Sequence, residues 1–539
     1  MDFIRVLSRA QKAILRMCEK EINLEKFTAI KEGKASVLTP VENTVFYNPI
    51  QQFNRDLSVT GIRAWAELER GRHAAIQKER LSRKRNADGE PKAQKVQQQQ
   101  KEEVEKEEEA EVELAGNDEE PSKPYITILE ALSASGLRAI RYAKEIPLVK
   151  SIVANDFSPS AVESIKRNIN HNGVQDIVKA NQGDAIVFMS QQQSQNAFHV
   201  IDLDPYGTAA PFIDSALQSI KDNGLLLVTC TDLGVLAGNG YPEKCFALYG
   251  GTNVWGDPTH ESALRLVLNL IASTAAKYKK TIEPQLCLSI DFYVRLFIKV
   301  KTSPIKVKEL MSNTMITYLC SGCGTTYNQP LGKKIINEKA TSKQNQYNFK
   351  RSQGPPCGSE CTYCGYKNHL TGPMWSGPLH NQEFMDKILE IQKTLPEDVY
   401  GTTSRIKGMV ILAKQELEQP FYFKPTSLSS VLHCQPPSIN ELAAAIGNSG
   451  YDVSLTHACP SAIKTDAPWE LIWLIMKKWI ELNPIKMDKL SETTAAFKIL
   501  TNEQLGKQSF PQGIEGIKFD LNETSKKIKT LRKARPDKD

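Results

Sequence analysis

Residues 200–207 read Val-Ile-Asp-Leu-Asp-Pro-Tyr-Gly, and this stretch decides how the rest of the chain is interpreted. An apolar run that ends at Asp204 is typical of a buried parallel strand, and ligands of open α/β sheets bind outside the carboxyl ends of such strands. The Asp204 carboxylate can accept a hydrogen bond from an exocyclic amine, and the carbonyl of Pro205, whose φ is restricted, can be a second acceptor. Tyr206 offers a ring on which a base can stack, and Gly207 permits a tight turn.

Together these residue types suit a site that methylates an amino group attached to an aromatic ring. The lone pair of such an amine is delocalised into the ring. Two hydrogen-bond acceptors would draw the nitrogen toward the tetrahedral geometry that attack on a sulfonium methyl requires. An ordinary strand-to-helix turn would also explain the stretch, because Asp-Pro is common in turns. The neighbouring segments are therefore needed to distinguish a methylation site from an ordinary turn.

The segment before this stretch has the pattern of a first β-loop-α unit. The apolar run Ile126–Leu129 predicts a strand, residues 133–136 form a loop of small residues, and a helix is predicted from Leu137. A dinucleotide-binding fold would require G-x-G-x-x-G, whereas Gly136 is the only glycine here, so pyrophosphate binding is disfavoured. S-adenosylmethionine has no phosphate and needs less glycine in this loop.

Two acids follow the next predicted strands. Asp156 ends the run 151–156, where a carboxylate can accept hydrogen bonds from ribose hydroxyls. Asp184 follows a third predicted strand, where an acid can meet the amine of adenine. Either residue could instead cap a helix N-terminus. Their order along a βαβα pattern favours a nucleoside ligand. With the apolar strands predicted up to residue 300, the fold class is α/β, with a Rossmann-like seven-stranded sheet that contains one antiparallel strand.

The composition is that of an ordinary globular protein with a basic surplus. The chain has 539 residues, 40% of them hydrophobic and 24% charged, which predicts two or three domains. It has no run of about 20 apolar residues, so no membrane span is expected. The net charge is +6, but residues 101–120 carry eleven acidic residues against two lysines, which leaves the remainder near +15. This balance favours a polyanionic partner. No stable protein partner is evident.

Five of the eleven cysteines lie between residues 320 and 364. Cys320 and Cys323 form one C-x-x-C pair, and Cys361 and Cys364 form another. Four thiolates at this spacing suit a tetrahedral structural zinc ion in a reducing compartment, although four unrelated thiols would be the alternative. Cys357 is a competing ligand, but Cys361-x-x-Cys-Gly fits a zinc knuckle better.

Several motifs along the chain closely match one known family. They are Phe46-Tyr-Asn-Pro, Asn54-Arg-Asp, Glu130-Ala-Leu-Ser-Ala-Ser-Gly-Leu-Arg, Ala154-Asn-Asp, Asp204-Pro-Tyr-Gly, Thr229-Cys-Thr-Asp-Leu, Gly240-Tyr-Pro-Glu-Lys-Cys and Gly372-Pro-Met-Trp-Ser-Gly-Pro-Leu-His. In these motifs the chain resembles the tRNA guanine-26 N2-dimethyltransferases, from about residue 28 to residue 475. The resemblance implies S-adenosylmethionine as the methyl donor and the N2 of guanine 26 in tRNA as the acceptor, methylated once or twice.

The resemblance also implies roles for individual residues. Asp204 would be the catalytic acceptor beside the Pro205 carbonyl, and Tyr206 and Phe46 would stack on the guanine. The residues that would contact the methyl donor are Arg55, Arg138, Asp156, Asp184 and Ala185. Without the resemblance, Phe46 is more simply a core residue. Ser135 stands where the family is expected to have threonine, which is a mild change within a loop of small residues.

The predicted domains follow from these motifs and from changes in composition. They are a possible amphipathic targeting segment at 1–27, the methyltransferase domain at 28–310 with a disordered charged insertion at 70–124, a zinc module at 311–380, a smaller α/β tRNA-binding domain at 381–490, and a basic tail at 491–539. Residues 526–538 of this tail are expected to be disordered until they meet RNA. The first segment is similar to a mitochondrial transit peptide, and residues 78–85 could direct the chain to the nucleus.

Two other functions remain open from the sequence. The same Asp-Pro-aromatic motif serves amino-methyltransferases that act on adenine or cytosine in nucleic acids. A non-catalytic zinc-ribbon protein that binds RNA would also explain the basic surplus and the cysteines.

Overall fold

The computed structural model describes residues 26–41, 47–87, 123–192, 197–339, 346–507, 509–510 and 512–535, and for residues 73–87 it describes the backbone. Phe46 and almost all of the predicted targeting segment lie outside these ranges. Within them, no helix is long and apolar enough to cross a membrane.

A seven-stranded sheet forms the centre of the protein. Its strand order is β5 (Val178–Gln182), β4 (Val149–Asp156), β3 (Ile126–Glu130), β6 (Phe198–Leu203), β7 (Ile220–Cys230), β9 (Tyr293–Thr302) and β8 (Lys280–Ile290). Strand β9 runs antiparallel to both of its neighbours, and the other neighbouring pairs are parallel. The predicted Rossmann-like sheet with one antiparallel strand is therefore confirmed. The apolar run in β6 is fully buried because helices cover both faces of the sheet.

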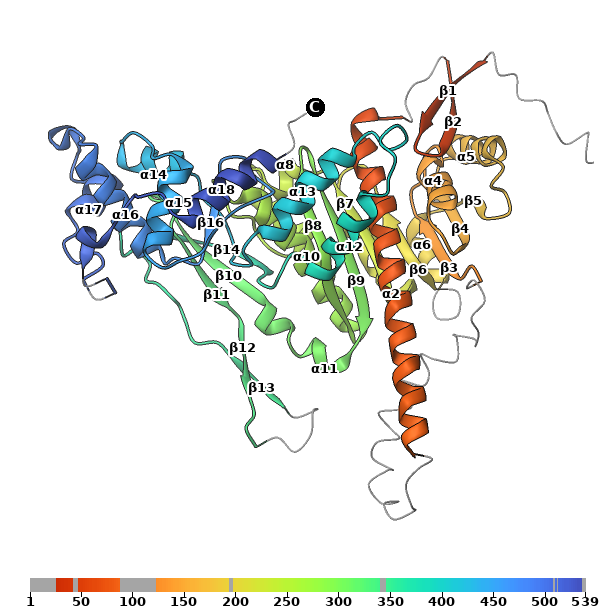
Figure 1. Cartoon of the computed structure of the whole chain (residues 1–539), viewed down its shortest axis with the longest axis horizontal. Helices are drawn as coiled ribbons and strands as arrows, with labels where there is room; N and C mark the ends of the chain where they lie inside the picture. Colours follow the sequence, from red (N-terminus) through yellow and green to blue (C-terminus); the bar gives the residue numbers. More distant parts are fainter. Residues whose placement is uncertain are drawn as a thin grey trace, which may run out of the picture.

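Helices pack on both faces of this sheet (Figure 1). On one face lie α2 (Gln52–Ala87), α4 (Leu137–Glu145), α5 (Pro159–Asn172), α12 (Gln382–Gln392) and α13 (Thr403–Gln415). On the other lie α6 (Ala185–Gln191), α7 (Ile213–Ser219), α8 (Leu233–Leu236), α9 (Pro242–Tyr249) and α10 (Thr259–Lys277). Successive side chains of β3 point to opposite faces of the sheet, so Ile128 lies in the first core and Leu129 in the second.

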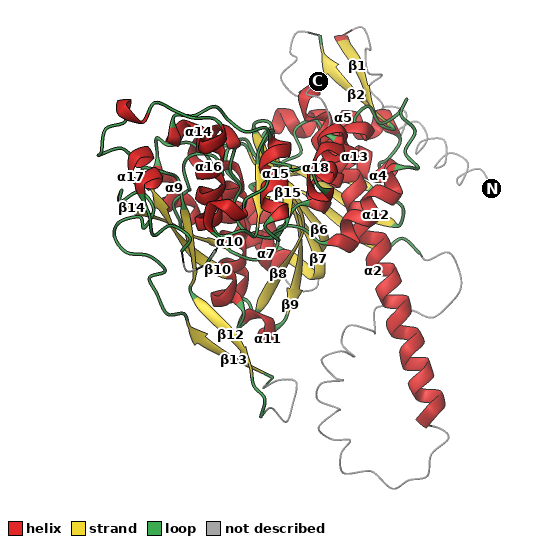
Figure 2. Cartoon of the chain, turned by 60° about the vertical axis from the view of Figure 1, so that its left-hand side comes forward, coloured by secondary structure: helices red, strands yellow, loops and turns green. Residues whose placement is uncertain are grey.

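Smaller elements surround the sheet. The hairpin of β1 (Phe27–Glu32) and β2 (Ala35–Pro40) packs against α5. Strands β11 (Thr326–Pro330), β10 (Thr314–Cys320) and β14 (Asn368–Trp375) form a three-stranded antiparallel sheet, and β12 (Gly332–Ile336) pairs with β13 (Tyr347–Arg351). Short helical segments are η2 (Pro49–Gln51), η4 (Ala210–Phe212), α11 (Pro304–Val307) and η5 (Leu310–Asn313). In Figures 1 and 2 the β12–β13 hairpin and the last turns of α2 extend beyond the rest of the protein.

A third core occupies the C-terminal region. Its elements are α14 (Pro425–Leu432), α15 (Ile439–Asn448), β15 (Val453–Leu455), β16 (Ile463–Thr465), α16 (Trp469–Leu482), η7 (Met487–Lys489), α17 (Ala495–Thr501), η8 (Gly513–Gly516) and α18 (Glu523–Ala534). Many of their apolar side chains gather in one cluster with the four cysteines of the C-x-x-C pairs. Helix α15 begins with a capping box formed by Ser438 and Glu441.

Three predictions about order and boundaries are wrong. Residues 70–87 are the second half of α2 and not part of a disordered insertion, because good helix formers continue a helix already fixed by its packed first half. Residues 88–122 lie outside the described ranges. The boundary predicted at 381 does not separate two cores, since α12 and α13 pack in the first one, where Phe384 lies 6.1 Å from Phe297 between ring centroids. Helix α18 in the predicted disordered tail is packed on α15, with Ile528 and Leu531 buried.

A buried polar cluster joins the C-terminal core to the rest of the protein. The Lys464 ammonium lies 3.1 Å from a carboxylate oxygen of Glu261 on α10 and 3.1 Å from one of Glu416. His457 contacts the other oxygen of Glu416 at 2.7 Å and accepts a hydrogen bond from the Ser289 amide of β8 at 3.2 Å. Elements from both regions therefore share charges that water does not reach.

Candidate active site

The turn that follows β6 stands at the carboxyl edge of the sheet. Gly207, with φ +80°, donates a hydrogen bond from its amide to the Thr231 hydroxyl at 2.8 Å, and the Thr231 amide donates to the Gly207 carbonyl at 2.9 Å. These bonds hold the turn against the end of β7. Pro205 is buried, whereas the Tyr206 side chain is 93% exposed. The ring is therefore presented to solvent, as a stacking surface requires.

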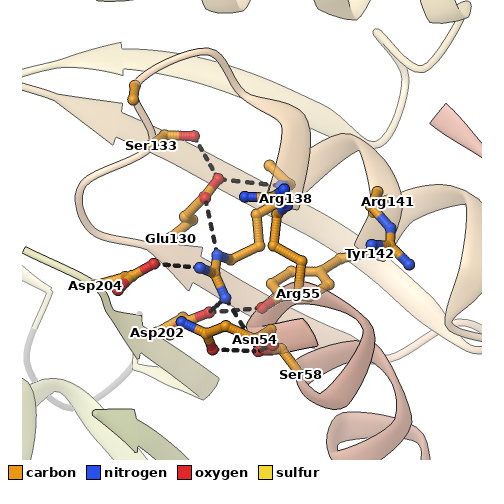
Figure 3. A network of polar contacts seen from close by, with 12 residues as sticks. Asn54, Arg55, Ser58, Glu130, Ser133, Arg138, Arg141, Tyr142, Asp202 and Asp204 are labelled. Carbon is orange, nitrogen blue, oxygen red and sulfur yellow. Dashed lines mark hydrogen bonds and ion pairs between the residues drawn. The ribbon is translucent and has the colours of Figure 1, made fainter. Parts of the chain in front are cut away.

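Arg138 holds the carboxylate of Asp204 (Figure 3). The guanidinium lies at the start of α4 and is almost fully buried; it donates to the Ser58 hydroxyl at 3.0 Å and lies 3.5 Å from Asp202 and 3.7 Å from Glu130. Because Asp204 pairs with a side chain fixed on several sides, its own orientation is fixed. The predicted contact of Arg138 with the methyl donor stays a prediction.

A second buried guanidinium, that of Arg295, contacts two of the residues that Arg138 contacts. Arg295 on β9 donates to Asp202 at 2.8 Å and to the Ser58 hydroxyl at 2.7 Å. The Tyr142 hydroxyl donates to the other oxygen of Asp202 at 2.6 Å. Burial alone would raise the pKa of Asp202, but Arg295 and Arg138 outweigh it and lower the pKa. The network therefore keeps Asp202 ionised and ties α2, α4, β6 and β9 together under the site.

Glu130 is the third carboxyl group of this network. Its side chain accepts hydrogen bonds from the Ser133 hydroxyl and from the backbone amide of Ala139. Burial raises the pKa of Glu130 to about 8, against the lowering effect of Arg138. With Glu130 protonated, the carboxylates of Asp202 and Asp204 balance the two buried guanidinium groups.

The predicted donor-binding acids lie at the same edge of the sheet, on β4 and after β5. Asp156 accepts hydrogen bonds from the amides of Ala134, in the loop after β3, and Ser158, both at 2.9 Å. Asp184 accepts from two amides in the first turn of α6, at 2.8 and 3.0 Å, so it caps that helix, and Ala185 is the buried residue that begins it. Their contacts with the nucleoside stay predictions.

Arg55, a predicted contact of the methyl donor, lies in a network with other side chains of the protein. Its guanidinium pairs with Glu32 of β1 and donates to the Asn48 carbonyl at 3.0 Å. Arg141 binds the same carboxylate at 2.7 Å. The predicted contact of Arg55 with the methyl donor stays a prediction. Phe46, the second predicted stacking residue, lies outside the described residues.

Three buried polar residues of this site were not predicted from the sequence. Ser58, Asp202 and Arg295 are fully buried polar residues on three separate elements. The available signal was a charge inside an apolar strand, in Val-Ile-Asp-Leu and in Tyr-Val-Arg-Leu-Phe. Two exposed rings at the same edge were also missed: Phe157, which follows Asp156, and Phe292, in the turn between β8 and β9.

The two C-x-x-C pairs meet in the C-terminal core. Their four sulfur atoms lie within 4.8 Å of one another, and all four side chains are buried. The two turns are alike: the amides of Gly324 and Gly365, both at positive φ, donate to the carbonyls of Cys320 and Cys361 at 3.1 and 2.8 Å. The set fits a structural zinc ion with four thiolate ligands. Cys357 does not belong to it.

Three comparisons with known proteins agree with this geometry. The family model described as N2,N2-dimethylguanosine tRNA methyltransferase matches residues 20–477. The mitochondrial tRNA (guanine(26)-N(2))-dimethyltransferase of Saccharomyces cerevisiae is 50% identical, over 95% of this chain and 90% of the relative. The enzyme of the same name from Schizosaccharomyces pombe is 46% identical, over 88% of this chain and 85% of the relative.

A solved structure is also similar. Trm1 from Pyrococcus horikoshii in complex with S-adenosyl-L-methionine shares 25% identity and a TM-score of 0.61, covering 83% of this chain and 98% of that protein. The chain therefore belongs to the family of N2,N2-dimethylguanosine tRNA methyltransferases.

Proposed function

We propose that this protein transfers one or two methyl groups from S-adenosylmethionine to the exocyclic N2 of guanine 26 in tRNA. The observation that carries the proposal is the Asp204 carboxylate, fixed by Arg138 at the carboxyl edge of the sheet beside the exposed ring of Tyr206. Relatives that cover most of the chain carry this activity in their names.

The chemistry assigns a task to each group of the turn. S-adenosylmethionine, when bound, supplies an activated methyl group. The flipped guanine would stack on Tyr206, and its N2 would donate one hydrogen bond to Asp204 and one to the Pro205 carbonyl, so that the nitrogen lone pair is directed at the methyl carbon. After transfer the nitrogen is positively charged. Asp204 then stabilises that charge or accepts the proton that leaves.

The donor would lie over the carboxyl ends of β3, β4 and β5. Asp156 would accept the ribose hydroxyls, and Asp184 with Ala185 would contact the adenine. Arg138 and Arg55 remain candidates for the amino-acid end of the donor. The position of Asp156, between the loop after β3 and the start of α5, supports the ribose assignment.

Zinc would stabilise the C-terminal core and take no part in methyl transfer. Four thiolates fill a tetrahedral coordination shell and leave no open position. We also propose a mitochondrial location, supported by the name of the Saccharomyces cerevisiae relative, and a second location in the nucleus, suggested by the basic run at residues 78–85.

The decisive experiment uses two tRNAs that differ in one amino group. Transcripts with guanine or inosine at position 26 are incubated with the protein and S-adenosylmethionine, and their nucleosides are analysed by mass spectrometry. Inosine lacks the exocyclic N2, so N2-methylguanosine and N2,N2-dimethylguanosine are expected with guanine 26 and no product with inosine 26. Methylated adenine or cytosine would favour another amino-methyltransferase. Binding without any methylation would favour a non-catalytic RNA-binding protein.

A further inference from the structure

The turn between β8 and β9 places an exposed aromatic ring beside the active site. The turn consists of Asp291 and Phe292, and the Phe292 side chain is 78% exposed. Because β9 is antiparallel to β7, with Val294 opposite Cys230, the turn lies at the carboxyl edge of the parallel strands. Strand β7 separates β9 from β6, which ends next to Asp204. The turn is therefore two strand spacings, about 10 Å, to the side of the catalytic turn.

This ring is one of a group. Among the described residues, the three most exposed aromatic side chains are Tyr206, Phe292 and Phe157, at 93%, 78% and 76%. Each of them follows the carboxyl end of a strand of the same sheet, β6, β8 and β4 respectively. Single exposed apolar residues are common on protein surfaces, but three rings along one edge mark a binding surface.

The turn does not need the ring of Phe292. Two-residue hairpin turns require positive φ at one or both central residues, a conformation that glycine, asparagine or aspartate adopts most easily. Here Asp291, with φ +44°, supplies that conformation, and Phe292 is not at positive φ. The turn therefore exposes a large apolar ring to water without benefit to the turn itself.

The tip of the turn is also held in place. Arg405 on α13 pairs with Asp291 at 2.6 Å, and its guanidinium lies 4.7 Å from the centroid of the Phe53 ring. On the other side, Tyr293 is buried in the first core, and its hydroxyl has no hydrogen-bond partner there. Because both neighbours of Phe292 are held, the backbone that carries its ring loses little conformational entropy when the ring binds.

We propose that Phe292 is an RNA-contact residue that stacks within the tRNA at the place that guanine 26 leaves. The inference rests on the proposed function. Withdrawal of a base into an enzyme pocket breaks its stacking on both neighbours, and an apolar side chain that enters the gap restores part of that stacking. Tyr206 serves the withdrawn base, and Phe292 serves the stack from which it came. The separation of about 10 Å between the two turns suits this division.

The test compares single substitutions on two tRNAs. Base–aromatic stacking contributes enough for Phe292→Ala to lower kcat/KM about 5-fold to 150-fold on ordinary tRNA. Phe292→Trp keeps a ring and should retain near wild-type kcat/KM, and Phe292→Leu should lie between the two. A tRNA with an abasic site opposite guanine 26 lets the guanine leave the stack more easily, so the loss in Phe292→Ala should shrink on this tRNA.

The matched control is Leu521→Ala. Leu521 is 69% exposed, in the segment before α18, and its replacement should leave kcat/KM unchanged. The melting temperature of every variant should equal that of the wild type, since each changed side chain is exposed. Wild-type kcat/KM in Phe292→Ala, or an equal loss on both tRNAs, would overturn the inference. A wild-type protein that methylates neither tRNA would overturn the proposed function instead.

Discussion

Replacement of Asp204 by asparagine removes a charge from the site while the shape of the side chain is kept. The side chain is 23% exposed, so an effective dielectric constant of about 20 applies to its interactions. A carboxylate about 4 Å from a nitrogen that becomes positively charged then contributes ~4 kcal/mol. Loss of this interaction should lower the rate of methyl transfer by about three orders of magnitude.

The assay is single-turnover transfer of a labelled methyl group to tRNA, with donor and protein in excess. The dissociation constant for tRNA should stay within about threefold of wild type, because the phosphate backbone dominates tRNA affinity. Asp214→Asn, an exposed aspartate on α7, is the matched control and should transfer methyl groups at the wild-type rate. A rate for Asp204→Asn within tenfold of wild type would refute the assigned role of the charge.

Three further predictions concern stability. Arg295→Met should lower the free energy of unfolding, measured with urea, by about 3–5 kcal/mol, because it leaves Asp202 buried with one guanidinium fewer. Adding Asp202→Leu should recover most of this loss. Full stability of the single variant would contradict the prediction. Cys364→Ser should abolish zinc binding in metal analysis and lower the melting temperature, whereas retention of one zinc per chain would exclude the four-cysteine site. Burial lowers the pKa of His380 to about 3. Below pH 6.5 the unfolded chain therefore binds a proton at His380 that the folded chain does not bind. The unfolding free energy should therefore decrease as the pH is lowered, by up to about 1.4 kcal/mol per pH unit, and His380→Gln should reduce this slope. Equal slopes in the two proteins would show that His380 is not buried as a neutral group.

The sequence predicts what depends on local patterns. Apolar runs that end in acids give the strands and the edge where Asp156, Asp184 and Asp204 lie, because the carboxyl ends of parallel strands meet at one edge. The C-x-x-C spacing likewise predicts the cysteine cluster, since the backbone turn of each pair brings its own two sulfur atoms together.

Partners that are distant in the sequence have no such pattern. Ser58 and Arg295 are 237 residues apart, and no pattern in either segment predicts that the two side chains are in contact. The same holds for Arg138 on α4, because its carboxylate partner, Asp204, follows the distant strand β6. Helices α12 and α13 have ordinary amphipathic patterns that do not tell which of two cores they cover. The length of α2 was missed for another reason, since its charged second half has the composition of a disordered segment.

The buried cluster around Lys464 has a consequence for how the protein melts. In a shortened chain that ends before Glu416, the Glu261 carboxylate would lose the Lys464 ammonium group that now lies 3.1 Å from it. Glu261 would then keep only Arg265, also on α10, as a charged partner. The catalytic sheet and the cysteine-containing region should thus denature as one cooperative unit, with a single heat-absorption peak in calorimetry.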